Sequence, residues 1–213
     1  MAKIALIGAT GFVGTEILKE ASSRGHSVTA LVRHPENVEN ATNVTAEKAD
    51  VFDAEALARQ ITGHDLVISA FNPGWGDSNI RENHIKGSRS INEAAKKAGI
   101  KRVIAVGGAG SLSINGQQLV DSPEFPAEWK EGALGARQAL EELRNEDGLE
   151  WTFVSPAITL QPGERTGKYR LGTDEPVFDD KGESIISAAD LAVAIVDEAE
   201  QNKHIRARFT AAY

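Results

Sequence analysis

Three glycines near the start of the chain, Gly8, Gly11 and Gly14, are separated from one another by two residues each. They follow an apolar run at residues 4–7 and precede a stretch with helical spacing, so the pattern predicts a strand, a turn and a helix. Gly8 permits a tight turn, Gly11 lets the backbone approach an anion without a Cβ, and Gly14 lets the helix pack closely. The N-terminus of a helix offers unpaired N–H groups to phosphate. We therefore expect this loop to bind the pyrophosphate of a dinucleotide.

The end of the next apolar run, residues 27–32, bears on which dinucleotide fits. Enzymes that use NAD place a carboxylate there for the ribose hydroxyls, whereas an arginine can pair with a 2′-phosphate. Here the run is followed by Arg33 and His34, with no acidic residue before Glu36. This favours NADPH over NADH; an exposed arginine at a strand end with no ligand is the alternative.

Short runs rich in Val and Ile alternate with helical patterns from the first residues to about residue 160. This alternation predicts an α/β fold, a Rossmann-type doubly wound parallel sheet. Strands are expected at residues 3–7, 27–32, 44–49, 65–70, 101–106 and 150–155. Helices are expected from Phe12 to near Gly25, after Asp53 as far as Gly63, at 80–98 and at 127–145. Residues 107–126 have no periodicity and should form a long loop at the carboxyl end of a strand, where such sheets bind ligands.

The sequence is expected to form a single domain over residues 1–213. Extended pieces around residues 168–171 and 176–186, a helix at 188–200 and a last strand at 206–211 follow the main pattern. Segments 157–187 and 201–213 are expected to contribute a small α+β lobe on the substrate side.

Composition excludes several classes of function. The chain has no cysteine, so thiolate catalysis and cysteine-bound metals are excluded. Its 31 acidic and 23 basic residues give a net charge of −8, which argues against nucleic acid as a partner. No apolar run approaches the roughly 20 residues that span a bilayer, and no secretory signal is visible, so we expect a cytoplasmic protein with no membrane partner. The five histidines lack the spacing of metal ligands.

The glycine spacing, together with "LVRHPENV", "KADVFD", "VISAFNPG", "KRVIAVGGAGSL" and "GERTGKYRLG", resembles a known family. The chain is similar to the atypical short-chain dehydrogenases that include NmrA-like proteins and biliverdin reductase B, and most similar to the NADH-flavin reductase group. The resemblance extends over nearly the whole chain.

The resemblance also implies positions for the cofactor NADP(H). It places the pyrophosphate at the glycine loop, the 2′-phosphate at Arg33 and the adenine near the third strand. Ends of the later strands would line the ribose and the nicotinamide, although ordinary strand ends would look the same. The implied contacts are Thr10, Gly11, Phe12, Val13, Arg33, Asp50, Val51, Ala70, Phe71, Asn72, Gly107, Gly108, Ser155, Pro156 and Ala157.

One family feature is missing from the sequence. Typical short-chain dehydrogenases reduce carbonyls with a Tyr-x-x-x-Lys pair, but residues 125–131 read "FPAEWKE". Neither tyrosine of the chain, Tyr169 or Tyr213, has a lysine four residues later. Ser111 and Tyr169 are therefore candidate proton donors, each with a purely structural alternative, and Lys130 is a weaker candidate.

The favoured function is an NADPH-dependent reductase that transfers hydride to a planar acceptor such as a flavin. Trp75 and Trp129 lie in segments expected to overhang the nicotinamide, where a flat ring could stack, although they could equally pack the protein. A non-catalytic NADP(H) sensor of NmrA type is the alternative. A sugar epimerase or dehydratase is a further one, disfavoured by the missing pair.

The sequence leaves the oligomeric state open between monomer and homodimer. The helix at residues 80–98 is a candidate dimer face because Gly87 and Ser88 are small, but such a helix could equally pack on the sheet.

Overall fold

The apolar runs of the sequence form buried parallel strands in the computed structural model, which describes residues 1–213. In β1 (Lys3–Ile7), Ile4, Ala5, Leu6 and Ile7 are all buried. Such a run without alternation is typical of a strand that is covered by helices on both faces. The α/β fold predicted from the sequence is confirmed.

The central sheet has the order β3-β2-β1-β4-β5-β8-β12-β10, and every neighbouring pair is parallel except β10 with β12. The chain order reverses between β1 and β4, which is the position where doubly wound sheets bind their ligands. The other strands of this sheet are β2 (Ser27–Val32), β3 (Val44–Lys48), β4 (Leu66–Ser69), β5 (Arg102–Val106), β8 (Glu150–Pro156), β10 (Arg170–Gly172) and β12 (Ala207–Ala212).

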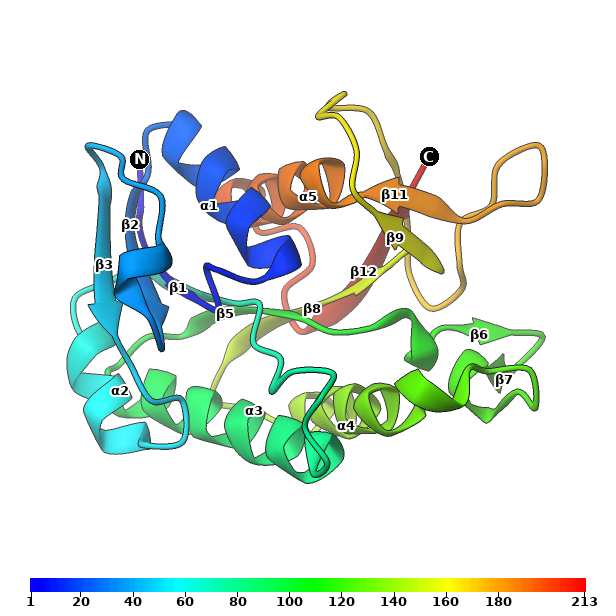
Figure 1. Ribbon diagram of the computed structural model, residues 1–213, viewed down its shortest axis with the longest axis horizontal. Helices are drawn as coiled ribbons and strands as arrows, with labels where there is room; N and C mark the ends of the chain where they lie inside the picture. The colour runs from blue at the N-terminus through cyan, green and yellow to red at the C-terminus, as the bar shows by residue number, and fades with distance from the viewer.

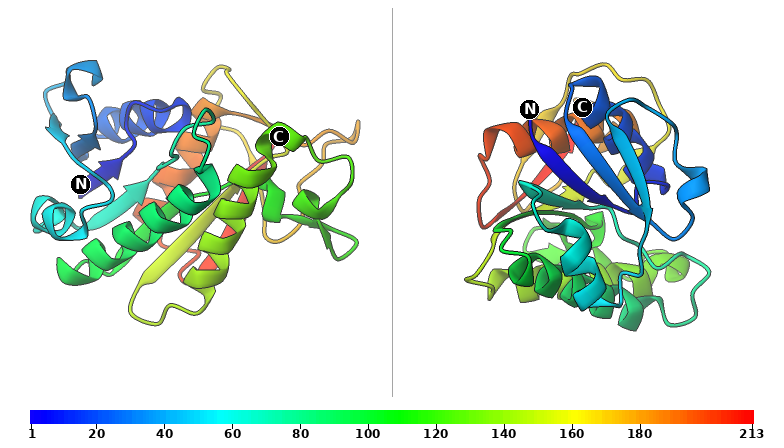
Figure 2. Two further views of the ribbon diagram at one scale, coloured as in Figure 1. Left: turned by 60° about the horizontal axis from the view of Figure 1, so that its bottom comes forward. Right: turned by 90° about the vertical axis from the view of Figure 1, so that its left-hand side faces the viewer.

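Helices cover both faces of the sheet (Figure 1). Two of them lie side by side on one face: α1 (Phe12–Ser23) and α5 (Ala188–Gln201). The opposite face carries α2 (Ala54–Ile61), α3 (Ile80–Lys97) and α4 (Ala127–Arg144), which Figure 2 shows from their outer side. Each face buries an apolar core of its own, so the strands are held between two hydrophobic layers.

The segment at residues 107–126 is more ordered than a simple loop. It contains a short hairpin, β6 (Ser113–Ile114) with β7 (Gln117–Gln118), between two single turns of 3₁₀ helix. Asn115 and Gly116 form the hairpin turn with positive φ angles of 53° and 81°. Asn-Gly is the sequence signal for a two-residue turn with both central residues left-handed.

The C-terminal part of the chain differs from the expected arrangement. Residues 207–212 extend the central sheet as β12, parallel to β8, instead of forming part of a separate lobe. A small two-stranded sheet pairs β9 (Thr159–Gln161) with β11 (Ile185–Ser187), so most of the expected strand at 176–186 is loop. The sequence did not predict this small sheet because strands of three residues, such as β9 and β11, leave almost no periodic pattern, and the two strands that pair are far apart in the chain.

A buried carboxylate holds this C-terminal part together. Asp190, in the first turn of α5, accepts hydrogen bonds from the N–H and hydroxyl of Thr166, the N–H of Gly167 and the hydroxyl of Tyr213. It therefore ties the segment after β9 and the end of β12 to the beginning of α5.

None of the helices is both long enough and apolar enough to cross a membrane.

Candidate cofactor and active site

The turn between β1 and α1 has room only for glycine at two of its positions. Gly8 has a φ of +80°, and a Cβ there would lie 2.7 Å from the carbonyl oxygen of Ala70. A Cβ on Gly14 would lie 2.0 Å from the carbonyl oxygen of Gly8. Contacts below 3.0 Å with backbone atoms cannot be relieved by a side-chain movement, so α1 approaches the turn this closely only because both residues are glycine.

The first turn of α1 offers free donors to an anion. The first helical N–H with an intrahelical partner is that of Thr15, which donates to the carbonyl of Gly11 at 2.9 Å. The N–H groups of Phe12, Val13 and Gly14 have no partner within the chain. The first turn also has no capping side chain and no acidic residue. Together with the positive end of the helix dipole, these groups fit the pyrophosphate of a dinucleotide.

Arg33 follows β2 at the same edge of the sheet. Its side chain is exposed and makes no ion pair and no hydrogen bond, and Glu36 is paired with His34 at 3.2 Å. The guanidinium is therefore available to a ligand, and no neighbouring carboxylate competes for it.

The end of β4 lies beside the glycine loop, but Phe71 does not point over it. The backbone of Ala70 and Phe71 lies directly against Gly8, and their contact with a ligand stays a prediction. The ring of Phe71 instead packs on α3, where a Cβ on Gly87 would come within 2.2 Å of it. The small residue of α3 thus accommodates a side chain of the same molecule, which removes one argument for a dimer face there.

Phe52 was not singled out from the sequence, although it follows Asp50 and Val51 directly. Its N–H donates to Asp50 Oδ1 at 2.9 Å, and its ring meets the Phe71 ring edge-on with centroids 6.1 Å apart. The ammonium of Lys86 lies 5.1 Å from the centre of the Phe52 ring. The signal in the sequence that could have identified Phe52 is an aromatic residue shortly after the expected third strand.

After the end of β4, Asn72 accepts a hydrogen bond from the N–H of Gly74 at 2.7 Å.

The residues that follow β5 and end β8, at the carboxyl edge of the sheet, have small or buried side chains. A Cβ on Gly107 would lie 2.0 Å from the Phe153 ring, so Gly107 lets this ring fill the space beneath it. Ser155, Pro156 and Ala157 are all buried, and the Ser155 hydroxyl has no hydrogen-bond partner.

The structure does not bring the two candidate proton donors together. Ser111 is only 2% exposed, and its hydroxyl oxygen accepts a hydrogen bond from Arg208 at 3.1 Å. Arg208 was missed, although an arginine within the apolar run "ARFTAA" indicates a buried charge that needs partners. Its guanidinium also binds the Ser111 carbonyl and Asp174. These contacts give Ser111 a structural role, and catalysis by it stays a prediction.

The hydroxyl of Tyr169 is engaged by a side chain of α5, and catalysis by Tyr169 stays a prediction. Its hydroxyl donates to Asp197 on α5, and Asp197 also accepts from Arg24 at 2.7 Å. Arg24 follows the C-terminal end of α1, about 18 Å along the helix from the glycine loop. Burial and the hydrogen bond to Asp197 raise the pKa of the Tyr169 hydroxyl well above its ordinary value, which makes it a poorer acid.

Trp75 and Trp129 are both largely exposed, by 61% and 52%. Trp75 comes from the loop after β4 and packs on α4, where a Cβ on Gly132 would lie 2.7 Å from the indole. Trp129 belongs to the first turn of the same helix.

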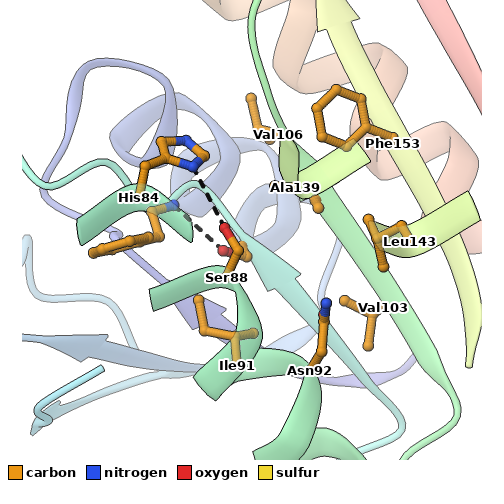
Figure 3. Close-up of a pocket in the computed structure, with 12 residues that line it drawn as sticks. His84, Ser88, Ile91, Asn92, Val103, Val106, Ala139, Leu143 and Phe153 are labelled. Atoms are coloured by element: carbon orange, nitrogen blue, oxygen red, sulfur yellow. Dashed lines mark hydrogen bonds between the residues drawn. The ribbon is translucent and has the colours of Figure 1, made fainter. Parts of the chain in front are cut away.

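His84 is a buried histidine beside a small cavity between the sheet, α3 and α4 (Figure 3). The cavity has a volume of about 20 Å³ and is also lined by Ser88 and Asn92. His84 Nδ1 lies 3.5 Å from the Ser88 hydroxyl. Burial lowers the pKa of His84 to about 4, so the imidazole is neutral at neutral pH.

Comparison with known proteins identifies the family. A family model described as NAD(P)H-binding matches residues 8–202. The chain belongs to this NAD(P)H-binding family. The match includes the glycine loop, Arg33 and the ends of β2, β3, β4, β5 and β8.

Three solved structures are similar to this member of the NAD(P)H-binding family over its whole length. A Burkholderia pseudomallei protein is 45% identical, with a TM-score of 0.90 and 100% of both chains covered. A Bacteroides thetaiotaomicron protein is 44% identical, with a TM-score of 0.93 and coverage of 100% and 97%. A Streptococcus pneumoniae protein is 39% identical, with a TM-score of 0.87 and coverage of 100% and 99%.

These three relatives are described differently. Their putative assignments are an exported protein, an epimerase and an NADH-flavin reductase, respectively. The similarity therefore establishes the fold and the NAD(P)H-binding family, while the reaction has to be argued from the site.

Gly14→Ala should weaken NADPH binding by more than about tenfold, because the new Cβ would push the first turn of α1 away from Gly8. Gly76→Ala is the matched control, since a Cβ there meets no atom within 4 Å and its φ is ordinary. Calorimetric titration of both folded variants, with circular dichroism to check the fold, measures the effect. Equal affinity in the two variants would contradict the role of this contact.

His84→Leu should make stability less dependent on pH. In the unfolded chain His84 has its ordinary pKa of 6.5, whereas in the folded protein its pKa is about 4. Between these two pH values the unfolded chain binds a proton that the folded protein does not, so the free energy of unfolding decreases as the pH falls through this range. At pH 5 the loss is about 2 kcal/mol relative to pH 7.5. Urea unfolding at both pH values should show a smaller pH effect in His84→Leu than in the exposed control His34→Leu, and an unchanged difference would refute the argument.

Proposed function

We propose that this protein is an NADPH-dependent reductase that transfers hydride to a planar acceptor such as a flavin. The observation that carries the proposal is the combination, at one edge of the sheet, of a free arginine at the end of β2 with two exposed indoles near the other end of the site. The first feature suits a cofactor with a 2′-phosphate, and the second suits a flat apolar ring.

The chain's own residues would bind and orient both reactants. The free N–H groups of Phe12, Val13 and Gly14 would hold the pyrophosphate, and Arg33 would pair with the 2′-phosphate. Trp75 and Trp129 would bind the acceptor ring and exclude water from it. NADPH, when bound, supplies the hydride; the protein supplies position, which accelerates a reaction between two bound partners.

Protonation favours an acceptor of this kind over a simple carbonyl. A positioned general acid contributes about 10²- to 10⁴-fold to a rate. Residues 127–130 at the start of α4 are Ala-Glu-Trp-Lys, and the hydroxyl of Tyr169 is engaged by Asp197. A reduced flavin can take its proton from solvent, so it loses less than a carbonyl when no acid is placed beside it.

The comparisons support a reductase but do not single one out. The Streptococcus pneumoniae relative is described as an NADH-flavin reductase and the Bacteroides thetaiotaomicron relative as an epimerase. An epimerase would also need a residue to move a proton at the sugar carbon, which favours the reductase for this chain. A protein that only senses NADP(H) has the same cofactor site and differs in having no turnover.

Anaerobic oxidation of NADPH with excess FMN, followed by absorbance, tests the proposal. We expect oxidation that depends on the protein and exceeds the rate of the enzyme-free control. Tight NADPH binding with no oxidation in the same preparation would instead support a sensor.

Arg33→Asp should shift the preference from NADPH toward NADH. Loss of charge-assisted hydrogen bonds to a phosphate costs about 1.5–3 kcal/mol, or about 10- to 100-fold in affinity for NADPH. The new carboxylate can accept from the ribose hydroxyls of NADH. Dissociation constants of both cofactors for the native protein and the variant measure the shift. If the ratio of the two dissociation constants is the same in the variant and the native protein, Arg33 does not bind the 2′-phosphate.

A further inference from the structure

The beginning of α4 carries a free positive charge beside the two exposed indoles. Trp129 and Lys130 lie in its first turn, and Trp75 packs over Gly132 one turn later. Because α4 leads into the parallel strand β8, the helix begins at the carboxyl edge of the sheet, where the cofactor loop also lies. The three side chains therefore belong to the acceptor end of the proposed site.

Helix geometry orders these side chains around the axis. Residues three and four apart share a face, so Trp129 lies on the same side as Gly132 and Ala133, which are buried. Each residue turns the helix by about 100°. Lys130 therefore lies on one flank of Trp129, and Glu128 lies on the other.

Lys130 differs from the nearby basic residues Arg81 and Arg137 because no carboxylate of the chain pairs with it. Glu131 pairs with Arg81 at 3.7 Å, and Arg137 pairs with Asp121 at 2.9 Å. Lys130 is exposed and makes no ion pair and no hydrogen bond. In a protein with a net charge of −8, an anion near the acceptor end is attracted by this ammonium and repelled by Glu128 on the opposite flank.

We infer that Trp75, Trp129 and Lys130 form a subsite for planar acceptors with an anionic tail, the ring lying on the indoles and the phosphate or carboxylate at Lys130. This inference rests on the proposed function and narrows its substrate class. FMN, which has a phosphate, is then a better acceptor than riboflavin, which has the same ring without one. Because the lysine is exposed, the preference is modest, about three- to tenfold, and decreases at high salt.

The test compares FMN with riboflavin in the native protein, in Lys130→Met and in the control Lys203→Met, which removes an exposed lysine after α5. The ratio of kcat/KM for FMN to that for riboflavin is measured with NADPH at low and high salt. We expect a ratio of about 3 to 10 for the native protein and the control, and a ratio near 1 for Lys130→Met. A ratio near 1 in the native protein, or the same ratio in all three proteins, would overturn the inference.

A binding measurement separates this inference from the proposed function. Flavin affinity is measured with NADP⁺ present by quenching of tryptophan fluorescence, which requires no turnover. Tighter binding of FMN than of riboflavin that is lost in Lys130→Met would support the subsite even if no flavin is reduced, and the proposed reaction alone would then fail. Turnover and binding that are both indifferent to the phosphate would overturn the subsite and leave the reductase standing. If no flavin binds and none is reduced, both are wrong.

Trp129→Leu and Trp75→Leu test whether the two indoles bind the flavin ring. Each should raise KM for FMN and riboflavin by the same factor, because both ligands have the same ring, whereas Lys130→Met changes FMN alone. Equal effects of all three substitutions on both flavins would show that the ammonium does not recognise the tail.

Discussion

The close approach of α1 to the turn after β1 is the constraint on which the site depends. The carbonyl oxygen of Gly8 occupies the space that a side chain at Gly14 would need, and Gly8 itself lies against the backbone after β4. This contact brings the first turn of α1 to the point where the chain order of the sheet reverses. Three N–H groups are left without partners there, and an anion is the ligand that satisfies them best.

The C-terminal part of the chain is held to this scaffold by buried charges and hydrogen bonds as well as by the apolar core that α5 and β12 share with α1. Asp190 binds the segment after β9, and the buried Glu20 of α1 pairs with Arg165 of the same segment at 2.6 Å. On the opposite face, Arg208 of β12 binds the turn that contains Ser111. The segment after β9 and the turn with Ser111 are thus each fixed by buried polar contacts, which suits the proposed site, whose contribution is to position two reactants.

Much of the fold could be predicted from the sequence because its signals are local. Strands β1, β2, β4 and β5 are short runs rich in Val, Ile, Leu and Ala. Asp53 caps α2 by accepting from the N–H of Ala56, as its position suggests. The partners of Ser111 and Tyr169 could not be predicted in this way. Ser111 meets an arginine 97 residues later and Tyr169 a carboxylate 28 residues later. Such pairs depend on how distant segments pack, and no spacing within the sequence encodes them.

The charges of the molecule also suit an anionic cofactor on an acidic protein. Many of the basic side chains are neutralised by partners, such as Arg24 by Glu20 and Asp197, or Arg102 by Glu198. Arg33 and Lys130 are not, and both lie at the carboxyl edge of the sheet, Arg33 after β2 and Lys130 at the beginning of α4. An overall negative surface repels anions at long range, but screening reduces that repulsion beyond about 8–10 Å at physiological salt. Free cations at the edge act within that distance, so this protein needs only a few well-placed positive charges to bind an anion there.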